Sequence, residues 1–152
     1  MSDAFDEPIP VLLVEDNPGD VRLTQEALKE GSVPVDLFVA EDGAQALDFL
    51  HRRPPFADAP RPALILLDLN LPRMNGREVL ALIKGDDRFR SIPVVVLTSS
   101  EAEKDIAEAY HYYANCFITK PVSFEKFMDV VKSIGGFWFH TVKLPRDERD
   151  AV

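Results

Sequence analysis

The segment Ala63-Leu64-Ile65-Leu66-Leu67-Asp68 decides the fold. It is an apolar run without polar alternation that ends in an aspartate. Such a run is typical of a parallel strand that is covered on both faces. We therefore predict a buried strand over residues 63–68, in a sheet with helices on both sides.

Four further apolar runs predict strands on either side of this segment, at 11–14, 35–40, 93–98 and 116–119. Helical patterns alternate with them at 17–30, 43–52, 77–84, 101–113 and from Ser123 onward. Asn17 suits a helix cap and Pro18 the first helical position, while Gly31 suits the end of that helix. In the second helix we expect Ala46, Leu47 and Leu50 to share one face. The proline-rich segment 53–62 predicts a loop.

Five β–α units imply a parallel sheet with helices on both faces. Right-handed crossovers leave few topologies, and the natural one is a flavodoxin-like (βα)5 doubly wound α/β fold with strand order 2-1-3-4-5. We expect a flexible tail over 1–8, one folded domain over 9–135 and a C-terminal extension over 136–152, with no output domain. The extension opens with Phe137-Trp138-Phe139, which either caps the core or forms an interface.

Composition narrows the possible partners and location. The net charge of −9 repels the phosphates of nucleic acid and of anionic lipid, so we expect neither as a partner. The single cysteine, Cys116, cannot form an internal disulfide, and the acidic N-terminus lacks the features of a signal peptide. We therefore expect a cytoplasmic protein.

Polar residues follow the predicted strands at their carboxyl ends, where such sheets bind ligands. They are Glu15, Asp16, Asp68, Thr98 and Lys120. A single acidic residue after a strand is usually a helix cap or a solvated loop residue. The topology, however, predicts that all five groups converge. Three neighbouring carboxylates repel one another, and Mg²⁺ would relieve this repulsion. One carboxylate could then attack phosphorus, while the metal and a lysine neutralise the transferring oxygens.

The sequence resembles the receiver domain of two-component response regulators. The matching motifs are Leu12-Leu13-Val14-Glu15-Asp16-Asn17, Leu66-Leu67-Asp68-Leu69-Asn70-Leu71-Pro72 followed by Asn75-Gly76, Val95-Val96-Leu97-Thr98-Ser99, and Thr119-Lys120-Pro121. The resemblance covers about residues 9 to 135. It implies a signalling protein that accepts a phosphoryl group from a histidine kinase and assists its own phosphotransfer, but is not an enzyme.

The resemblance also assigns roles to these residues. Asp68 matches the phosphoacceptor. Glu15 and Asp16 match the acidic pair that holds Mg²⁺, and Asp68 and the backbone carbonyl of Asn70 complete the protein ligands. Because Asn70 and Ser100 cannot act as strong bases, we expect only slow autodephosphorylation.

The remaining roles concern the conformational switch. Thr98 matches the hydroxyl that reorients toward the phosphoryl group, and Lys120 matches the cation that pairs with it. Phe117 occupies the aromatic switch position. The bond between Lys120 and Pro121 is expected to be cis.

Other features resemble the small regulators that are paired with bacterial and cyanobacterial phytochromes. These are Asn17-Pro18-Gly19-Asp20, the proline-rich loop, residues 110–116, and Phe137-Trp138-Phe139 leading to Val142-Lys143-Leu144-Pro145. This resemblance implies a phytochrome kinase as donor. It also implies a homodimer. We expect the switch to change the face formed by 101–113, 116–119 and the helix from Ser123, and we expect this face to form the dimer and to contact an unknown downstream protein.

Three alternatives compete with this interpretation. A phosphohydrolase with an aspartyl nucleophile would need a second aspartate at position 70, which is Asn70 here. A flavin-binding protein would need a hydroxyl- and glycine-rich first loop, where Glu15 and Asp16 stand instead. A receiver that binds partners without phosphorylation would not need Asp16, Asp68, Thr98 and Lys120 together.

Overall fold

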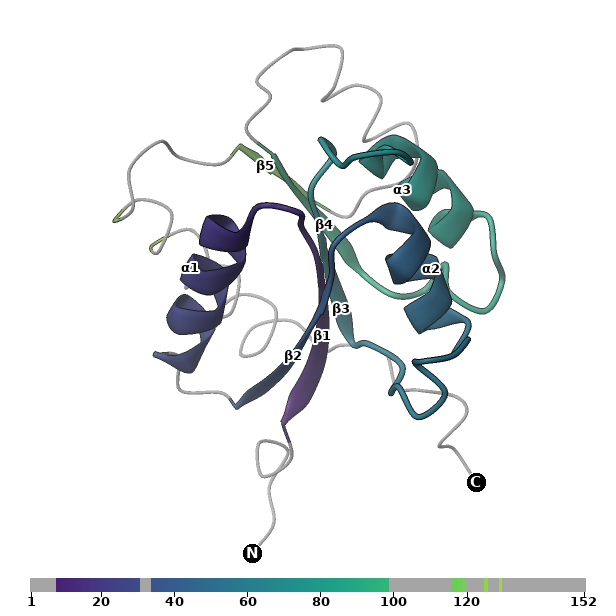
Figure 1. The fold of residues 1–152 in the computed structure, drawn as a ribbon, viewed down its shortest axis with the longest axis horizontal. Helices are drawn as coiled ribbons and strands as arrows, with labels where there is room; N and C mark the ends of the chain where they lie inside the picture. The colour runs from purple at the N-terminus through teal and green to yellow at the C-terminus, as the bar shows by residue number, and fades with distance from the viewer. Residues whose placement is uncertain (1–7, 31–33, 99–115, 120–124, 126–128, 130–152) are drawn as a thin grey trace, which may run out of the picture.

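A computed structural model of the chain describes residues 8–30, 34–98, 116–119, 125 and 129. These residues contain one five-stranded sheet in the order β2-β1-β3-β4-β5, and every neighbouring pair is parallel (Figure 1). The predicted strand order is therefore confirmed. The strands are β1 (Ile9–Val14), β2 (Val35–Ala40), β3 (Leu64–Leu67), β4 (Val94–Thr98) and β5 (Cys116–Thr119).

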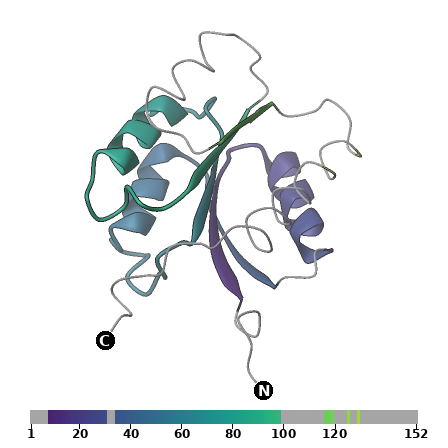
Figure 2. The ribbon, with the colours of Figure 1, turned by 180° about the vertical axis from the view of Figure 1, so that it is seen from behind.

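The described helices cover both faces of the sheet. The helix α1 (Pro18–Lys29) lies on one face, and α2 (Gly43–Leu50) and α3 (Gly76–Lys84) lie on the other, as the opposite views in Figures 1 and 2 show. The start of α1 is as predicted, because the Asn17 side chain accepts hydrogen bonds from the backbone amides of Gly19 and Asp20 at 2.9 and 3.2 Å.

Two apolar clusters sandwich the sheet. One lies under α2 and α3 and includes Ile65, Leu67 and Leu80. The other lies under α1 and includes Leu64 and Leu66. Successive residues of β3 thus alternate between two buried faces, and all four are fully buried. The prediction from the unbroken apolar run is confirmed.

The helix α2 differs from its prediction at its end and on its buried face. It ends at Leu50 rather than near position 52, because the backbone of Arg52 has a φ of 56° and cannot continue a helix. Phe49, not Leu47, packs into the core beside Leu50. The Phe49 ring lies against the rings of Phe38 and Phe56, with centroids 5.2 and 5.6 Å apart.

The loop predicted over 53–62 contains no helix or strand, and its Pro54–Pro55 peptide bond is cis. In the part of the chain that the structure describes, no helix has the length and apolar character to cross a membrane. The helices predicted over 101–113 and from Ser123, the dimer face that includes them, and the aromatic segment 137–139 lie outside the described residues. The domain limits 9–135 stay a prediction.

Candidate functional site

The register of the central strands brings the ends of β1 and β3 together. Val14 pairs with Leu67, so Glu15 and Asp68 leave the sheet side by side. The backbone amide of Asp68 donates a hydrogen bond to the carbonyl oxygen of Val14 at 3.0 Å. The amide of Glu15 donates to Ala40 in β2, also at 3.0 Å. The backbone on both sides of the site is therefore fixed by the sheet.

Three carboxylates gather at this edge. Glu15, Asp16 and Asp68 each offer one oxygen, and these three atoms lie within 4.8 Å of one another. Glu15 and Asp68 are buried, with 3% and 7% of their surfaces exposed, whereas Asp16 is exposed. The structure thus brings together the three carboxylates that the topology was expected to join, and their roles stay predictions.

The donor set of this carboxylate cluster fits a small divalent cation. Hard cations such as Mg²⁺ prefer oxygen ligands and keep some positions for water or phosphate oxygens. Two of the carboxylates are also held in place by backbone amides. Glu15 accepts a hydrogen bond from the amide of Asn17 at 3.3 Å, and Asp68 accepts one from the amide of Asn70 at 2.9 Å. Cation binding would offset the mutual repulsion of the carboxylates.

The loop from β3 to α3 is tied to the start of α2. Arg73 lies 3.5 Å from the carboxylate of Asp42, measured between Nη1 and Oδ2. Asp42 is largely buried and caps α2, because its other oxygen accepts a hydrogen bond from the amide of Gln45 at 2.8 Å. The role of Asp42 was not among the predictions, although an aspartate directly before a helix is a capping signal.

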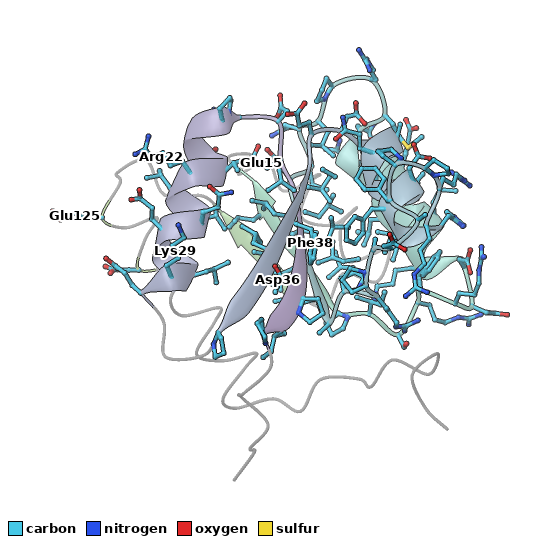
Figure 3. All side chains as sticks on the ribbon, turned by 60° about the horizontal axis from the view of Figure 1, so that its bottom comes forward. Glu15, Arg22, Lys29, Asp36, Phe38 and Glu125 are labelled. Atoms are coloured by element: carbon cyan, nitrogen blue, oxygen red, sulfur yellow. The ribbon has the colours of Figure 1, made fainter. Side chains whose placement is uncertain are left out.

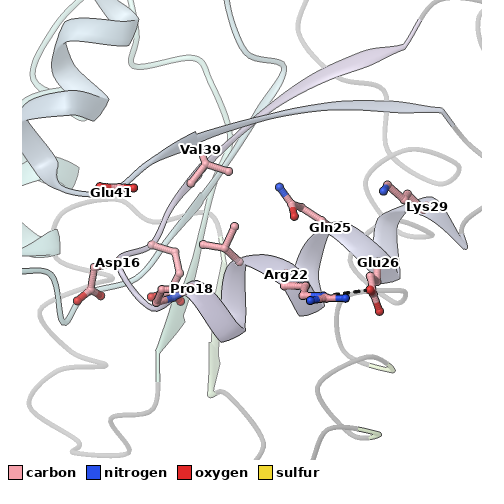
Figure 4. A pocket seen from close by; sticks show the side chains of 10 residues that line it. Asp16, Pro18, Arg22, Gln25, Glu26, Lys29, Val39 and Glu41 are labelled. Carbon is pink, nitrogen blue, oxygen red and sulfur yellow. Dashed lines mark hydrogen bonds and ion pairs between the residues drawn. The ribbon is translucent and has the colours of Figure 1, made fainter.

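A hollow of about 420 Å³ opens beside the carboxylate cluster, between α1 and β2. Figure 4 shows it running from Asp16 along α1 to Lys29, with the Arg22–Glu26 ion pair (3.4 Å) on its wall. In Figure 3, Arg22 and Lys29 extend from α1, and Glu15 lies at the end of β1. Asp68 does not line the hollow, so the hollow reaches only two of the three carboxylates, Glu15 and Asp16. Its lining residues are Glu15, Asp16, Pro18, Val21, Arg22, Gln25, Glu26, Lys29, Val39 and Glu41.

Of the other predicted site residues, the structure describes only the backbone of Thr98 and Phe117. Thr98 ends β4 and pairs with Thr119 of β5, and Lys120 is the next residue in the sequence. Phe117 lies within β5. The side chains of Thr98 and Phe117, and the whole of Lys120 and Pro121, lie outside the described part of the chain.

The surroundings of the loop that follows α3 change the pKa values of three side chains. The hydrogen-bonded Arg88 side chain, 2.8 Å away, lowers the pKa of Asp86 to about 2. Burial lowers the pKa of Lys84 to about 8. Burial also lowers the pKa of His51, and the charges of Arg53 and Arg88 add to this effect. Arg88 contacts both Asp86 and His51, and Lys84 donates to the carbonyl oxygens of Arg90 and Ile92, so these groups stabilise the end of α3 opposite the carboxylate cluster.

A family model and a curated protein match most of the chain. The family model described as the response regulator receiver domain matches residues 11–132. Response regulator Rcp1 of Synechocystis sp. is 45% identical over 145 residues, which cover 95% of this chain and 99% of Rcp1.

Two solved structures are similar over most of the chain. The phosphorylated cyanobacterial phytochrome response regulator RcpA has a TM-score of 0.89 and 46% identity, covering 92% of this chain and 100% of RcpA. The Mn²⁺-bound form of Rcp1 has a TM-score of 0.88 and 45% identity, covering 91% of this chain and 100% of Rcp1.

Proposed function

Because this chain belongs to the response regulator receiver family, we propose that Asp68 accepts a phosphoryl group from a histidine kinase, with Mg²⁺ bound beside it. The observation that carries the proposal is the meeting of Glu15, Asp16 and Asp68 within 4.8 Å at the carboxyl edge of the sheet. Phosphorylation would then change a protein-binding surface, and this change would be the output signal.

The cation would be held by Glu15, Asp16 and Asp68, with the backbone carbonyl of Asn70 as a further ligand. When bound, it supplies positive charge that stabilises the transferring phosphoryl oxygens. The described residues support this role, since all three side chains offer oxygen donors and exposed Asp16 leaves the cluster open to solvent. The similar Mn²⁺-bound form of Rcp1 is a second line of support.

In the transfer itself, an oxygen of the Asp68 carboxylate forms a bond to phosphorus. The bond between phosphorus and the kinase histidine nitrogen breaks, and its electron pair returns to that nitrogen. The Asn70 amide, 2.9 Å from Oδ1 of Asp68, holds the carboxylate in a fixed orientation for this attack.

The phosphorylated state would be recognised by two residues at the neighbouring strand ends. We assign Lys120 the role of pairing with the phosphoryl oxygens, and Thr98 the role of hydrogen bonding to them. The pairing of Thr98 with Thr119 supports this assignment, because Lys120 is the next residue along the chain. Phe117 would then change its packing as the loop after β4 moves, with Pro121 in the cis form shaping the loop after β5.

The partners are proposed from similar proteins. The similarity to RcpA and Rcp1 supports a phytochrome histidine kinase as the donor. We further propose a homodimer through the face that includes residues 101–113, β5 and the helix from Ser123, and a protein target that binds the same face. The cytoplasmic location stays a prediction from the sequence.

Metal binding tests the site directly. Free Mn²⁺ can be counted by its paramagnetic resonance signal as protein is added. We expect Asp16→Asn and Asp68→Asn to weaken Mn²⁺ binding by about tenfold or more. The matched control is Asp36→Asn, which changes an exposed carboxylate on β2 (Figure 3) and should bind as wild type does. Equal binding by all four proteins would contradict the proposed site.

The kinase assignment needs a separate experiment. A phytochrome kinase and an unrelated histidine kinase, both carrying labelled phosphohistidine, are each mixed with the protein. We expect label to reach Asp68 much faster from the phytochrome kinase. Equal rates from both donors would contradict the phytochrome assignment while leaving the receiver chemistry intact.

A further inference from the structure

Gly76, the first residue of α3, has no room for a side chain. A Cβ atom at this position would lie 2.4 Å from the carbonyl oxygen of Asp68 and 2.5 Å from the Cα of Leu69. Both neighbours are backbone atoms, so no side-chain rotation could relieve the overlap. None of the described glycines has a positive φ, so Gly76 is required for space and not for a left-handed backbone.

The first turn of α3 therefore rests directly on the backbone that carries the proposed phosphoacceptor. The amide of Gly76 donates a hydrogen bond to the carbonyl oxygen of Leu69 at 2.9 Å. The side chain of Leu69 is fully buried in the apolar cluster under α2 and α3, which holds the backbone at Leu69 in place. The Asn75 side chain caps the same turn by accepting a hydrogen bond from the amide of Glu78 at 3.0 Å.

A second contact holds the backbone on the other side of the Asp68 Cα atom. The amide of Asp68 is bound to Val14, the last residue of β1, at 3.0 Å. Since Val14 directly precedes Glu15, this bond links the positions of the buried carboxylates Glu15 and Asp68. The backbone at Asp68 is thus clamped between β1 and α3, and a shift at either side would change the spacing of the carboxylate cluster.

We propose that Gly76 is a positioning residue for the phosphoacceptor and its metal site. Its missing side chain lets α3 press against the Asp68–Leu69 backbone and hold the Asp68 carboxylate at the distance that cation binding requires. The inference rests on the proposed function, because it assigns Gly76 a role in that same site. Gly76→Ala should move the loop from β3 to α3. It should weaken metal binding more than other substitutions in α3 that lower the stability of the fold.

Other glycines in the described residues provide controls, because their neighbours are different. A Cβ at Gly43 would meet the side chains of Val79 and Met74 at 2.6 and 3.2 Å, and neither contact is with the backbone of Asp68. A Cβ at Gly85, at the other end of α3, would lie 3.0 Å from the carbonyl oxygen of Ala81. Gly85→Ala therefore alters the same helix without touching Asp68.

The experiment compares Gly76→Ala with Gly85→Ala and with Ile83→Val, which loosens the core under α3. Urea unfolding measures the loss of stability, titration measures the affinity for Mn²⁺, and intact-mass spectrometry measures the rate of phosphorylation by acetyl phosphate. We expect Gly76→Ala to weaken Mn²⁺ binding and slow phosphorylation by about tenfold. The two controls should stay within about twofold of wild type in both measurements.

The outcomes distinguish a failure of the proposed function from a failure of the role assigned to Gly76. If wild type itself neither binds Mn²⁺ nor accepts a phosphoryl group, the proposed function fails. If wild type does both and folded Gly76→Ala matches its controls, the positioning role of Gly76 is overturned. Should Gly76→Ala not fold, Asn75→Ala takes its place, because it removes the cap and loosens the same turn without adding an atom near Asp68. It should weaken Mn²⁺ binding at least about twofold, and unchanged binding would overturn the inference.

Discussion

The amide of Asp68 is hydrogen-bonded to the carbonyl oxygen of Val14, 3.0 Å away across the two central strands. This bond joins residues that are far apart in the sequence, and it places Asp68 next to Glu15 and Asp16. The meeting of Asp68 with Glu15 and Asp16 is therefore a consequence of sheet pairing. Three carboxylates gathered at one edge of the sheet repel one another, and this repulsion should lower the free energy of unfolding.

The first prediction concerns the charge of the carboxylate cluster. In the presence of EDTA, Asp68→Asn should raise the free energy of unfolding by about 1 kcal/mol, because it removes one of three neighbouring negative charges. Adding Mg²⁺ should raise the urea midpoint of wild type but not that of the variant. Asp36→Asn, far from the cluster, should respond to Mg²⁺ as wild type does. A variant that is less stable than wild type in EDTA contradicts the account.

The second prediction compares two leucines on α3. Leu80 is fully buried, whereas Leu82 is 50% exposed. Leu80→Ala should lower the free energy of unfolding by about 2–5 kcal/mol, because it leaves a cavity beneath the helix. The free energy of unfolding of Leu82→Ala should stay within about 0.5 kcal/mol of wild type, since substitutions of exposed residues rarely change it by more. Urea unfolding checks both values, and similar losses of stability at the two positions would contradict the burial of Leu80 beneath α3.

The third prediction concerns the backbone of Arg73, which has a φ of 64°. Arg73→Gly and Arg73→Ala both remove the contact with Asp42, but only glycine adopts this conformation without strain. We expect the glycine variant to be the more stable of the two by about 0.5–1 kcal/mol. At Arg53, whose φ is not positive, the same pair of substitutions should give the opposite order. An alanine advantage at position 73 would be incompatible with the observed loop.

The fourth prediction is a pH dependence. Burial lowers the pKa of Lys84 from its ordinary value of 10.5 to about 8, while its ammonium group donates hydrogen bonds to the carbonyl oxygens of Arg90 and Ile92. Between pH 8 and 10.5 the unfolded chain binds more protons at this residue than the folded chain does. The contribution of Lys84 to stability should therefore rise with pH across this window.

Comparison with Lys84→Met isolates this effect, since all other titrating groups are shared. The difference in unfolding free energy between wild type and variant should grow in favour of wild type from pH 7.5 to pH 9.5. A difference that stays constant or shrinks over this range would show that burial does not dominate the environment of Lys84.

Several features could be predicted because they depend on patterns within single segments. The unbroken apolar run before Asp68 indicated a strand buried on both faces, and Asn17 with Pro18 indicated the start of α1. The meeting of Glu15, Asp16 and Asp68 followed from parallel topology alone, because the carboxyl ends of parallel strands share one edge.

Other features depend on how particular segments approach one another, which sequence patterns do not encode. Leu47 and Phe49 both fit a helical stripe, and the ring contacts with Phe38 and Phe56 decide that Phe49 is the buried one. The left-handed backbone of Arg73 and its contact with Asp42 arise from the path of a loop. The overlap that excludes a side chain at Gly76 likewise becomes visible only when α3 is placed against β3.

The most direct test of the central claim is intact-mass spectrometry after incubation with Mg²⁺ and acetyl phosphate. Wild type, Asp68→Asn and the surface control Asp36→Asn are compared, each with and without EDTA. The account predicts that wild type and the control gain the mass of one phosphoryl group only when Mg²⁺ is present, and that Asp68→Asn gains none. A phosphoryl group that is acquired equally by Asp68→Asn, or by wild type in EDTA, would contradict it.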